Sequence, residues 1–223
     1  MLALSNISQI YKQGNESIKV LDNLSLKLDN FCNVGLIGPS GSGKSTLLNL
    51  IGLLENPTSG RIKINDLDCE ELNLEEKTNF RRNNIGFIFQ NNQLLEDFTC
   101  EENVALPLIL NGISYKESIL KAQELLIDLG LKTRMQIKPS LLSGGEQQRV
   151  AVLRALIKKP LIILADEPTG SLDDLNAKKV FKLIINLSKK QKATTITATH
   201  NIELLSYFDI CYKIEKGKLI EYK

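Results

Sequence analysis

The sequence predicts an α/β fold in which a parallel sheet is covered by helices on both faces. Three observations lead to this. Short strand-like runs alternate with helical segments along the 223 residues. The run Leu161 to Ala165 is continuously apolar, as in a strand buried on both faces. The helical stretch between residues 90 and 161 is too long for one crossover connection, so a helical subdomain is expected at about residues 91–158.

The expected elements follow one another in chain order. Strands of an N-terminal antiparallel β region and of the parallel core are expected at Leu2 to Ile7, Val20 to Leu28, Asn33 to Ile37, Arg61 to Ile64, Ile85 to Gln90, Leu161 to Ala165 and Ala193 to Thr199. Helices are expected at Lys44 to Leu53, Lys116 to Leu129 and Asp174 to Lys189. The chain should close with a hairpin, Ile210 to Ile214 and Lys218 to Tyr222, around Glu215-Lys216-Gly217.

Composition excludes several classes of protein. Hydrophobic content of 43% and charged content of 24% are ordinary for a globular domain. With a net charge of +2 and scattered lysines, the sequence has no basic cluster of the kind that binds nucleic acid, so no nucleic-acid partner is expected. No apolar run approaches the roughly 18–20 residues that span a bilayer, and no secretory signal is evident at the start. The four cysteines (Cys32, Cys69, Cys100 and Cys211) are far apart and are expected to be small buried residues in a reducing cytosol.

The strongest chemical signal is a phosphate-binding loop (P-loop). Its residues, with the next helical position, are Gly38, Pro39, Ser40, Gly41, Ser42, Gly43, Lys44, Ser45 and Thr46. The glycines let successive N–H groups point at the β- and γ-phosphates of a nucleotide, and the helix dipole adds positive potential. Lys44 should bridge the phosphates, and the Ser45 hydroxyl should ligate Mg²⁺. The alternative, a chance glycine-rich turn, does not account for the strand before the loop and the helix after it.

Two carboxylates and the single histidine follow other predicted strands. Asp166 and Glu167 come directly after the apolar run ending at Ala165, at the carboxyl end of a strand, where parallel sheets bind ligands. Asp166 should hold Mg²⁺, and Glu167 should polarise the attacking water as general base. The alternative is an acid pair at a helix start. His200 closes the strand Ala193 to Thr199 and should orient water and bind the γ-phosphate, although a lone histidine is usually structural.

A second glycine-paired turn lies about a hundred residues after the P-loop. It reads Leu142-Ser143-Gly144-Gly145-Glu146-Gln147-Gln148-Arg149 and opens another helix. Because a P-loop already supplies most of what one nucleotide needs, this helix start is expected to bind an anion of a second molecule's nucleotide. Together the two motifs resemble those of the ATP-binding cassette (ABC) ATPases, and the resemblance extends from end to end of the chain.

The resemblance implies further roles and an assembly. Residues 1–223 should form one ABC nucleotide-binding domain that hydrolyses ATP. Ser143, Gly144, Gly145 and Glu146 should bind the γ-phosphate held by the opposite subunit of a two-fold homodimer. Gln90 resembles the family's Q-loop glutamine, which reaches metal or water and senses the γ-phosphate. Tyr11, before the first hairpin, matches the aromatic that stacks on adenine, with a packed strand-end tyrosine as the alternative. Asp173 matches the D-loop at the dimer interface.

Within the family the chain most resembles the lipoprotein-releasing ATPases (LolD). The resemblance rests on Arg81 to Gln90, Leu94 to Thr99, Glu102 to Leu108 and Ala165 to Asp173. Macrolide-export ATPases (MacB) and the division ATPase FtsE share much of this sequence, so an export ATPase or a module signalling to cell-wall hydrolases remains an alternative. Asn91-Asn92-Gln93 departs from the aromatic-histidine segment of many LolD proteins.

The resemblance finally implies a place and a partner. The chain should act as a peripheral subunit at the cytoplasmic face of a bacterial inner membrane, bound to integral membrane subunits. The docking segment is expected between Gln90 and about Leu110, where an apolar series includes Leu95 and Phe98. Pro107 is expected to interrupt helix continuation and hold a groove open there. The alternative is that these apolar side chains only fill the subdomain core.

Overall fold

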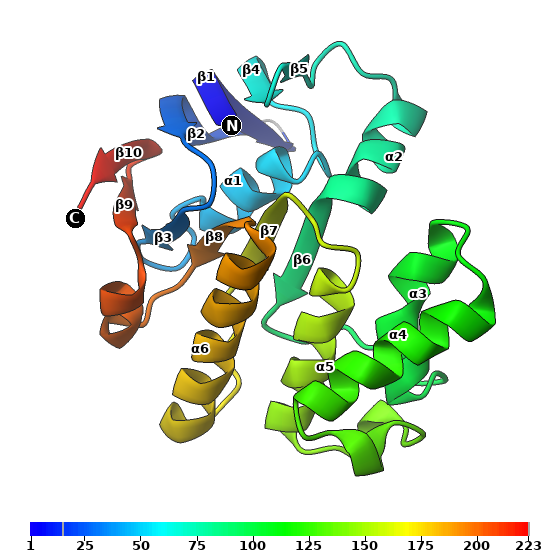
Figure 1. Ribbon diagram of the computed structural model, residues 1–223. Coiled ribbons are helices and arrows are strands. Elements are labelled where there is room, and N and C mark those ends of the chain that lie inside the picture. Colours follow the sequence, from blue (N-terminus) through cyan, green and yellow to red (C-terminus); the bar gives the residue numbers. More distant parts are fainter. Residues whose placement is uncertain (15, 223) are drawn as a thin grey trace. The chain divides into compact units, whose positions relative to one another are not determined.

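The computed structural model describes residues 1–14 and 16–222 and divides into two units (Figure 1). Unit 1 comprises residues 1–81 and 194–223, and unit 2 comprises residues 82–193. Both ends of the chain belong to unit 1, because the chain leaves it after Arg81 and returns at Thr194. The division falls inside helix α2 (Leu74–Asn84).

Unit 1 contains an antiparallel sheet with the strand order β2-β1-β4-β5. Its strands are β1 (Leu2–Gln13), β2 (Glu16–Leu28), β4 (Ser59–Ile64) and β5 (Leu67–Asp68). The register places Leu2 opposite Leu28 on one side and opposite Ile64 on the other, and all three side chains are buried. Apolar residues of the predicted strand-like runs therefore form one buried face of the sheet, whereas β5 was not predicted.

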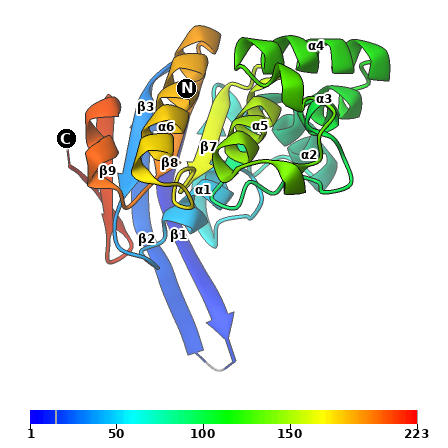
Figure 2. The same cartoon turned by 90° about the horizontal axis from the view of Figure 1, so that it is seen from below.

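The β1–β2 ribbon is longer than the sequence predicted. β1 continues to Gln13 and β2 begins at Glu16, and the ribbon extends well beyond the rest of the antiparallel sheet (Figure 2). The added pairs, such as Tyr11 opposite Ile18, leave both side chains exposed. Because no buried face exists in this part of the ribbon, the sequence lacks the alternation that identifies a strand.

Unit 1 also contains strands of the predicted parallel type, in the order β10-β9-β3-β8. They are β3 (Asn33–Ile37), β8 (Thr194–Ala198), β9 (Ile210–Glu215) and β10 (Lys218–Glu221). β3 runs parallel to both β8 and β9, and every residue of β3 and β8 is buried. The predicted hairpin between β9 and β10 is confirmed. Its turn has Lys216 and Gly217 at φ of 49° and 76°, the left-handed pair of a type I′ turn.

Unit 2 contains two parallel strands, β6 (Ile85–Phe89) and β7 (Ile162–Asp166). Helices α5 (Gly144–Leu156) and α6 (Asp174–Gln191) pack with them. Val152 of α5 and Ile184 of α6 lie in one buried cluster with Ile88 and Ile163 of the strands. Strands alternating with helices were predicted here, and both strands begin and end within a residue of the predicted bounds.

The rest of unit 2 is helical. It consists of α3 (Cys100–Leu110), α4 (Tyr115–Asp128) and 3₁₀ segments at Lys132–Arg134 and Pro139–Leu141. α3, α4 and α5 share a buried core that includes Val104, Ala122, Leu126 and Val150 (Figure 1). Side-chain caps define where α3 and α4 begin, because Thr99 and Ser114 each accept a hydrogen bond from the N–H three residues later.

One helix was missed, and two predictions about local structure are wrong. α2 was not predicted, and it has no buried residue, so it carries no apolar period for the sequence to reveal. Pro107 does not interrupt its helix, because α3 runs through it to Leu110. Cys32 is half-buried rather than buried, whereas the other three cysteines are buried, and all four are free thiols.

Candidate functional site

The predicted P-loop joins β3 to α1 (Lys44–Ile51) in unit 1. Gly38 and Gly43 have φ of 153° and 103°, which side-chain-bearing residues rarely adopt. A Cβ at Gly38 would lie 2.7 Å from Ser42 Oγ, and a Cβ at Gly43 would lie 2.9 Å from Leu21 Cδ2. Only glycine fits either position, so the backbone forms the tight cradle that the motif requires.

The groups that line the loop suit a phosphate. Lys44 is 7% exposed, and its Nζ donates hydrogen bonds to the carbonyls of Gly38 (2.8 Å) and Pro39 (2.9 Å). The ammonium therefore lies against the loop at the start of α1, where the helix dipole is positive. Ser42 Oγ is buried and makes no hydrogen bond within the described part of the chain. A positive charge, a helix start and an unsatisfied hydroxyl in one cradle fit an anionic ligand.

His200 lies at the same sheet edge as the P-loop. β8 and β3 are parallel neighbours, with Leu36 opposite Ala198, and the Thr199 N–H donates to the Leu36 carbonyl at 3.0 Å. His200 follows immediately and is exposed. The Thr199 hydroxyl accepts a hydrogen bond from Asn201 N–H at 3.0 Å, so the chain turns just beyond the strand. The predicted position of His200, at the carboxyl end of a parallel strand, is confirmed.

Tyr11 lies inside β1 and not before the hairpin, which corrects the sequence interpretation. Its hydroxyl donates to Glu55 Oε2 at 2.6 Å, and Glu55 Oε1 accepts from Asn49 Nδ2 of α1 at 3.0 Å. Burial, together with this hydrogen bond to a carboxylate, raises the pKa of Tyr11. The side chain is 36% exposed, so its ring keeps free surface while its hydroxyl ties it to α1.

Gln90, Asp166 and Glu167 lie at one edge of the two strands of unit 2. In the parallel register Phe89 is opposite Asp166, so Gln90 and the carboxylates leave the strands side by side. A turn follows them, closed by the hydrogen bond from Gly170 N–H to the Glu167 carbonyl, at 3.0 Å. A Cβ at Gly170 would lie 3.0 Å from Gln90 Nε2, so the turn packs closely on the glutamine. Glu167 has φ of 46°, an unusual conformation for this residue type.

These residues supply oxygens of the kind Mg²⁺ prefers. The Ser45 hydroxyl is exposed in the first turn of α1, and the Asp166 carboxylate is half-buried at the end of β7. Mg²⁺ usually takes one or two protein oxygens and completes its shell with phosphates and water. The Ser45 hydroxyl of unit 1, and the Asp166 carboxylate and Gln90 amide oxygen of unit 2, are each of the type that Mg²⁺ takes alongside phosphates.

The second glycine turn caps α5. Ser143 is the N-cap, and its backbone N–H and hydroxyl donate to Glu146 Oε2 at 2.9 and 2.8 Å. Arg134 Nε donates to the other carboxylate oxygen at 2.9 Å. The hydrogen bonds from Ser143, backbone first, and from Arg134 lower the pKa of Glu146 to about 2. Glu146 thus holds Ser143 in place, while the first N–H groups of α5, at Gly144 and Gly145, have no partner within the helix.

The predicted D-loop lies beside this turn within unit 2. Asp173 is the N-cap of α6, and its carboxylate accepts from Asn176 N–H (3.0 Å) and Asn176 Nδ2 (2.6 Å). These hydrogen bonds lower the pKa of Asp173. A Cβ at Gly144 would lie 3.5 Å from Leu172 Cδ2, and one at Gly145 would lie 3.6 Å from Asn176. The glycine turn at the start of α5 therefore lies directly next to the start of α6.

Sequence reasoning did not single out Arg134 or Gln148, although both support predicted site residues. Gln148 Nε2 donates to the Phe89 carbonyl at 3.0 Å, directly before Gln90, and the side chain is 1% exposed. Gln148 lies four residues before buried Val152, so a polar residue on the apolar face of α5 was the available signal. The contact of Arg134 with Glu146 left no local pattern in the sequence.

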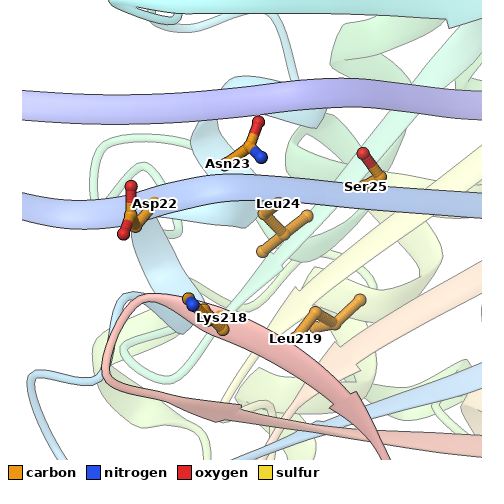
Figure 3. A pocket seen from close by; sticks show the side chains of 6 residues that line it. All are labelled: Asp22, Asn23, Leu24, Ser25, Lys218 and Leu219. Carbon is orange, nitrogen blue, oxygen red and sulfur yellow. The ribbon is translucent and has the colours of Figure 1, made fainter.

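A groove on unit 1 holds none of the predicted site residues. It lies between β2 and β10 and is lined by Asp22, Asn23, Leu24, Ser25, Lys218 and Leu219 (Figure 3). The two strands meet at one end of it, where Asp22 N–H donates to the Gly217 carbonyl at 2.9 Å. The groove is thus a gap between two strands, and its lining includes no residue of the P-loop.

Comparison with known proteins identifies the class. A family model described as ABC transporter matches residues 21–170. The chain belongs to this family, and its predicted fold and its activity as an ATPase are confirmed. No helix within residues 1–14 and 16–222 has the length and apolar character needed to cross a bilayer.

The chain is similar over nearly its whole length to lipoprotein-releasing ATP-binding proteins. The "Lipoprotein-releasing system ATP-binding protein LolD" of Rickettsia bellii is 47% identical, covering 98% of this chain and 97% of the relative. The protein of the same name from Colwellia psychrerythraea is 42% identical, covering 98% and 85%. The cassette MJ0796, solved as a dimer in a post-hydrolysis state bound to ADP and Pi, is 39% identical with a TM-score of 0.92, covering 100% and 98%.

Proposed function

We propose that this chain is the ATP-hydrolysing subunit of a bacterial inner-membrane ABC transporter that powers release of lipoproteins from that membrane. Two findings support the proposal. The chain has the P-loop cradle of an ATPase, with Lys44 aimed into it. Its relatives at 40–47% identity are lipoprotein-releasing system ATP-binding proteins.

In this proposal each site residue has its own role in ATP binding or hydrolysis. The N–H groups of the P-loop and Lys44 bind the β- and γ-phosphates, and Tyr11 stacks on the adenine. Ser45, Asp166 and Gln90 hold Mg²⁺, which when bound neutralises charge on the phosphates. Glu167 accepts the proton of the attacking water as general base, and His200 orients that water by a hydrogen bond.

One observation supports the proposed assembly: the chain has two separate helix starts, each preceded by a turn that contains glycine. The first is the P-loop at α1, and the second is the capped turn Ser143–Gly145 at α5. We propose that the second helix start binds the γ-phosphate held by the P-loop of another copy, while the Glu146 carboxylate holds Ser143 in position. Two copies then enclose two ATP molecules, with Asp173 at the interface, and hydrolysis releases them.

The wider setting follows from the same proposal. Residues 1–223 form one nucleotide-binding domain, with a helical subdomain at about residues 91–158 that carries the second phosphate-binding turn. The homodimer binds integral membrane subunits and lies at the cytoplasmic face of the inner membrane as a peripheral component. The membrane subunits recognise the lipoprotein, and the cassette supplies the energy.

Mixing two inactive variants tests the composite site. Lys44→Ala should abolish nucleotide binding to its own chain, because the phosphates lose their cation. Ser143→Arg should leave binding to the monomer nearly unchanged yet block dimerisation and hydrolysis. Mixed heterodimers should regain ATPase activity through one intact site. Ser140→Arg, the same change at an exposed serine, is the matched control and should remain active. If Ser143→Arg weakens monomer binding as strongly as Lys44→Ala, the second helix start does not act in trans.

A release assay tests the substrate. Membrane subunits that co-purify with the chain in mild detergent should be reconstituted with it to measure stimulated ATP hydrolysis. Lipoprotein release should be measured separately in spheroplasts. Release that requires both ATP and Glu167 supports the proposal. Stimulated hydrolysis without release contradicts lipoprotein as the substrate while leaving the ATPase assignment intact.

A further inference from the structure

The segment that follows β6 is fastened to helix α5 by side chains of that helix. Arg154 donates from Nη1 to the Gln93 carbonyl (2.7 Å) and from Nη2 to the Asn92 carbonyl (2.8 Å). Gln148 donates to the Phe89 carbonyl at the end of β6. These carbonyls lie at the end of a strand and in a loop, so the α5 side chains supply the hydrogen bonds that regular structure does not.

Gln147 extends the connection to the phosphate-binding turn. Its Oε1 accepts from Asn92 Nδ2 at 2.9 Å, and its Nε2 donates to the carbonyls of Pro139 (2.8 Å) and Leu142 (3.4 Å). Because Nε2 faces two carbonyl oxygens, the amide can adopt only this orientation. Leu142 directly precedes Ser143, so one side chain joins the segment after Gln90 to the base of the turn.

Asn92 is also fixed in orientation. Its Oδ1 accepts from the Leu94 N–H at 3.1 Å, which leaves its Nδ2 to face Gln147. Gln147 and Arg154 lie on one face of α5, since positions separated by seven residues are about two turns apart, whereas Gln148 lies on the adjacent, buried face. The same helix therefore carries the second phosphate-binding turn at its start and holds the Gln90 segment along its side.

We propose that Gln147 and Arg154 are positioning residues that lock the segment Gln90–Leu94 to α5. The phosphate sensor of one site and the phosphate-binding turn of the other then move as one rigid body within unit 2. Neither residue touches nucleotide, and each acts through the segment it holds. The proposal rests on the nucleotide roles proposed above for Gln90 and Ser143.

Asn92→Asp tests the lock with a change of a single functional group. The aspartate keeps the acceptor for Leu94 N–H but turns an oxygen toward Gln147 Oε1, so a hydrogen bond becomes a repulsion. Binding of a fluorescent ATP analogue to the P-loop should stay within about twofold, whereas kcat should fall about tenfold, as for the loss of one partly buried hydrogen bond and its replacement by a repulsion. Asn30→Asp, the same change at an exposed turn residue, should leave both unchanged.

A second substitution should restore the lock. Gln147→Lys in the Asn92→Asp background offers an ammonium that donates to the aspartate and to the Pro139 carbonyl. It should return kcat to within about threefold of wild type. Arg154→Lys should lower kcat as Asn92→Asp does, because lysine lacks the planar fork that reaches two carbonyls. Hydrogen exchange at residues 90–94 should rise in Asn92→Asp and return to the wild-type rate in the double variant.

Three results would overturn the proposal. These are an unchanged kcat in Asn92→Asp, a parallel loss of nucleotide affinity and kcat, or a double variant as impaired as the single one. Failure of the proposed nucleotide roles looks different, since Ser143→Arg would then leave hydrolysis unchanged.

Discussion

Protonation of Glu146 should weaken the start of α5. Its carboxylate accepts hydrogen bonds from the backbone and hydroxyl of Ser143 and from Arg134, and these lower its pKa to about 2. The pKa of an unfolded glutamate is about 4.3. Because the folded value is the lower one, the carboxylate contributes full stability above about pH 5, and this contribution is lost as the pH falls toward 2.

The size of this change in the free energy of unfolding follows from the two contacts of the Glu146 carboxylate, with Ser143 and with Arg134. A capping box contributes about 1 kcal/mol. The ion pair contributes less than about 1 kcal/mol, because the Arg134 side chain is 44% exposed and solvent screens it. Glu146→Ala removes the ion pair and the carboxylate half of the capping box, and should lower the free energy of unfolding by roughly 1–1.5 kcal/mol at pH 7. Glu146→Gln keeps an acceptor for the capping box and should cost less than about 1 kcal/mol.

Urea unfolding followed by circular dichroism at pH 7 and pH 3 measures these effects. Wild type should lose more stability between the two pH values than either variant, because the variants lack the group that titrates. Glu124→Gln removes an exposed carboxylate of α4 and should retain the wild-type acid sensitivity. If Glu146→Gln is as acid-sensitive as wild type, another group carries the pH dependence and the reasoning fails.

Two further predictions concern catalysis and coupling. Glu167→Gln should bind ATP normally, lower kcat by about 10²-fold or more and trap an ATP-bound dimer on gel filtration, whereas near-normal turnover would remove Glu167 from the mechanism. Leu95 and Phe98 are 41% and 39% exposed, so replacing both with serine should change stability by only about 0.5 kcal/mol per site. That double variant should keep its ATPase activity without the membrane subunits and lose stimulation by them. Unfolding, or full stimulation in reconstituted membranes, would place the docking surface elsewhere.

Prediction from sequence succeeded where a local pattern has a single physical cause. β3 was predicted with its observed bounds, because a buried strand leading into a glycine loop needs a continuous apolar run. The start of α1 at Lys44 and the N-cap at Ser143 follow from the backbone that each loop requires. The ends of β6, β7 and β8 were predicted well enough to put Gln90, Asp166 and His200 at strand ends.

Prediction failed where contacts decide the structure and leave no period in the sequence. The outer part of β1 and β2 forms by pairing across the ribbon, and α2 buries no side chain. The hydrogen bonds from α5 to the Gln90 segment end on backbone carbonyls, which every residue has. A glutamine or arginine in a helix does not reveal from sequence which distant carbonyl it reaches.

The expected docking segment is organised differently from its prediction. Leu94, Val104 and Leu108 are buried in the helical core, so the alternative of core filling holds for them. Leu95 and Phe98 remain exposed, and Pro107 does not interrupt α3, which continues to Leu110.

The loop that carries Leu95 and Phe98 is held by Asn103, which is fully buried. The Asn103 Oδ1 accepts from Leu95 N–H at 2.9 Å, and its Nδ2 donates to the carbonyls of Leu95 (3.0 Å) and Phe98 (3.2 Å). A buried amide satisfied in this way fixes the backbone on both sides of the exposed pair. The two apolar side chains are therefore presented by a preorganised loop, so a partner that binds them has less loop entropy to overcome.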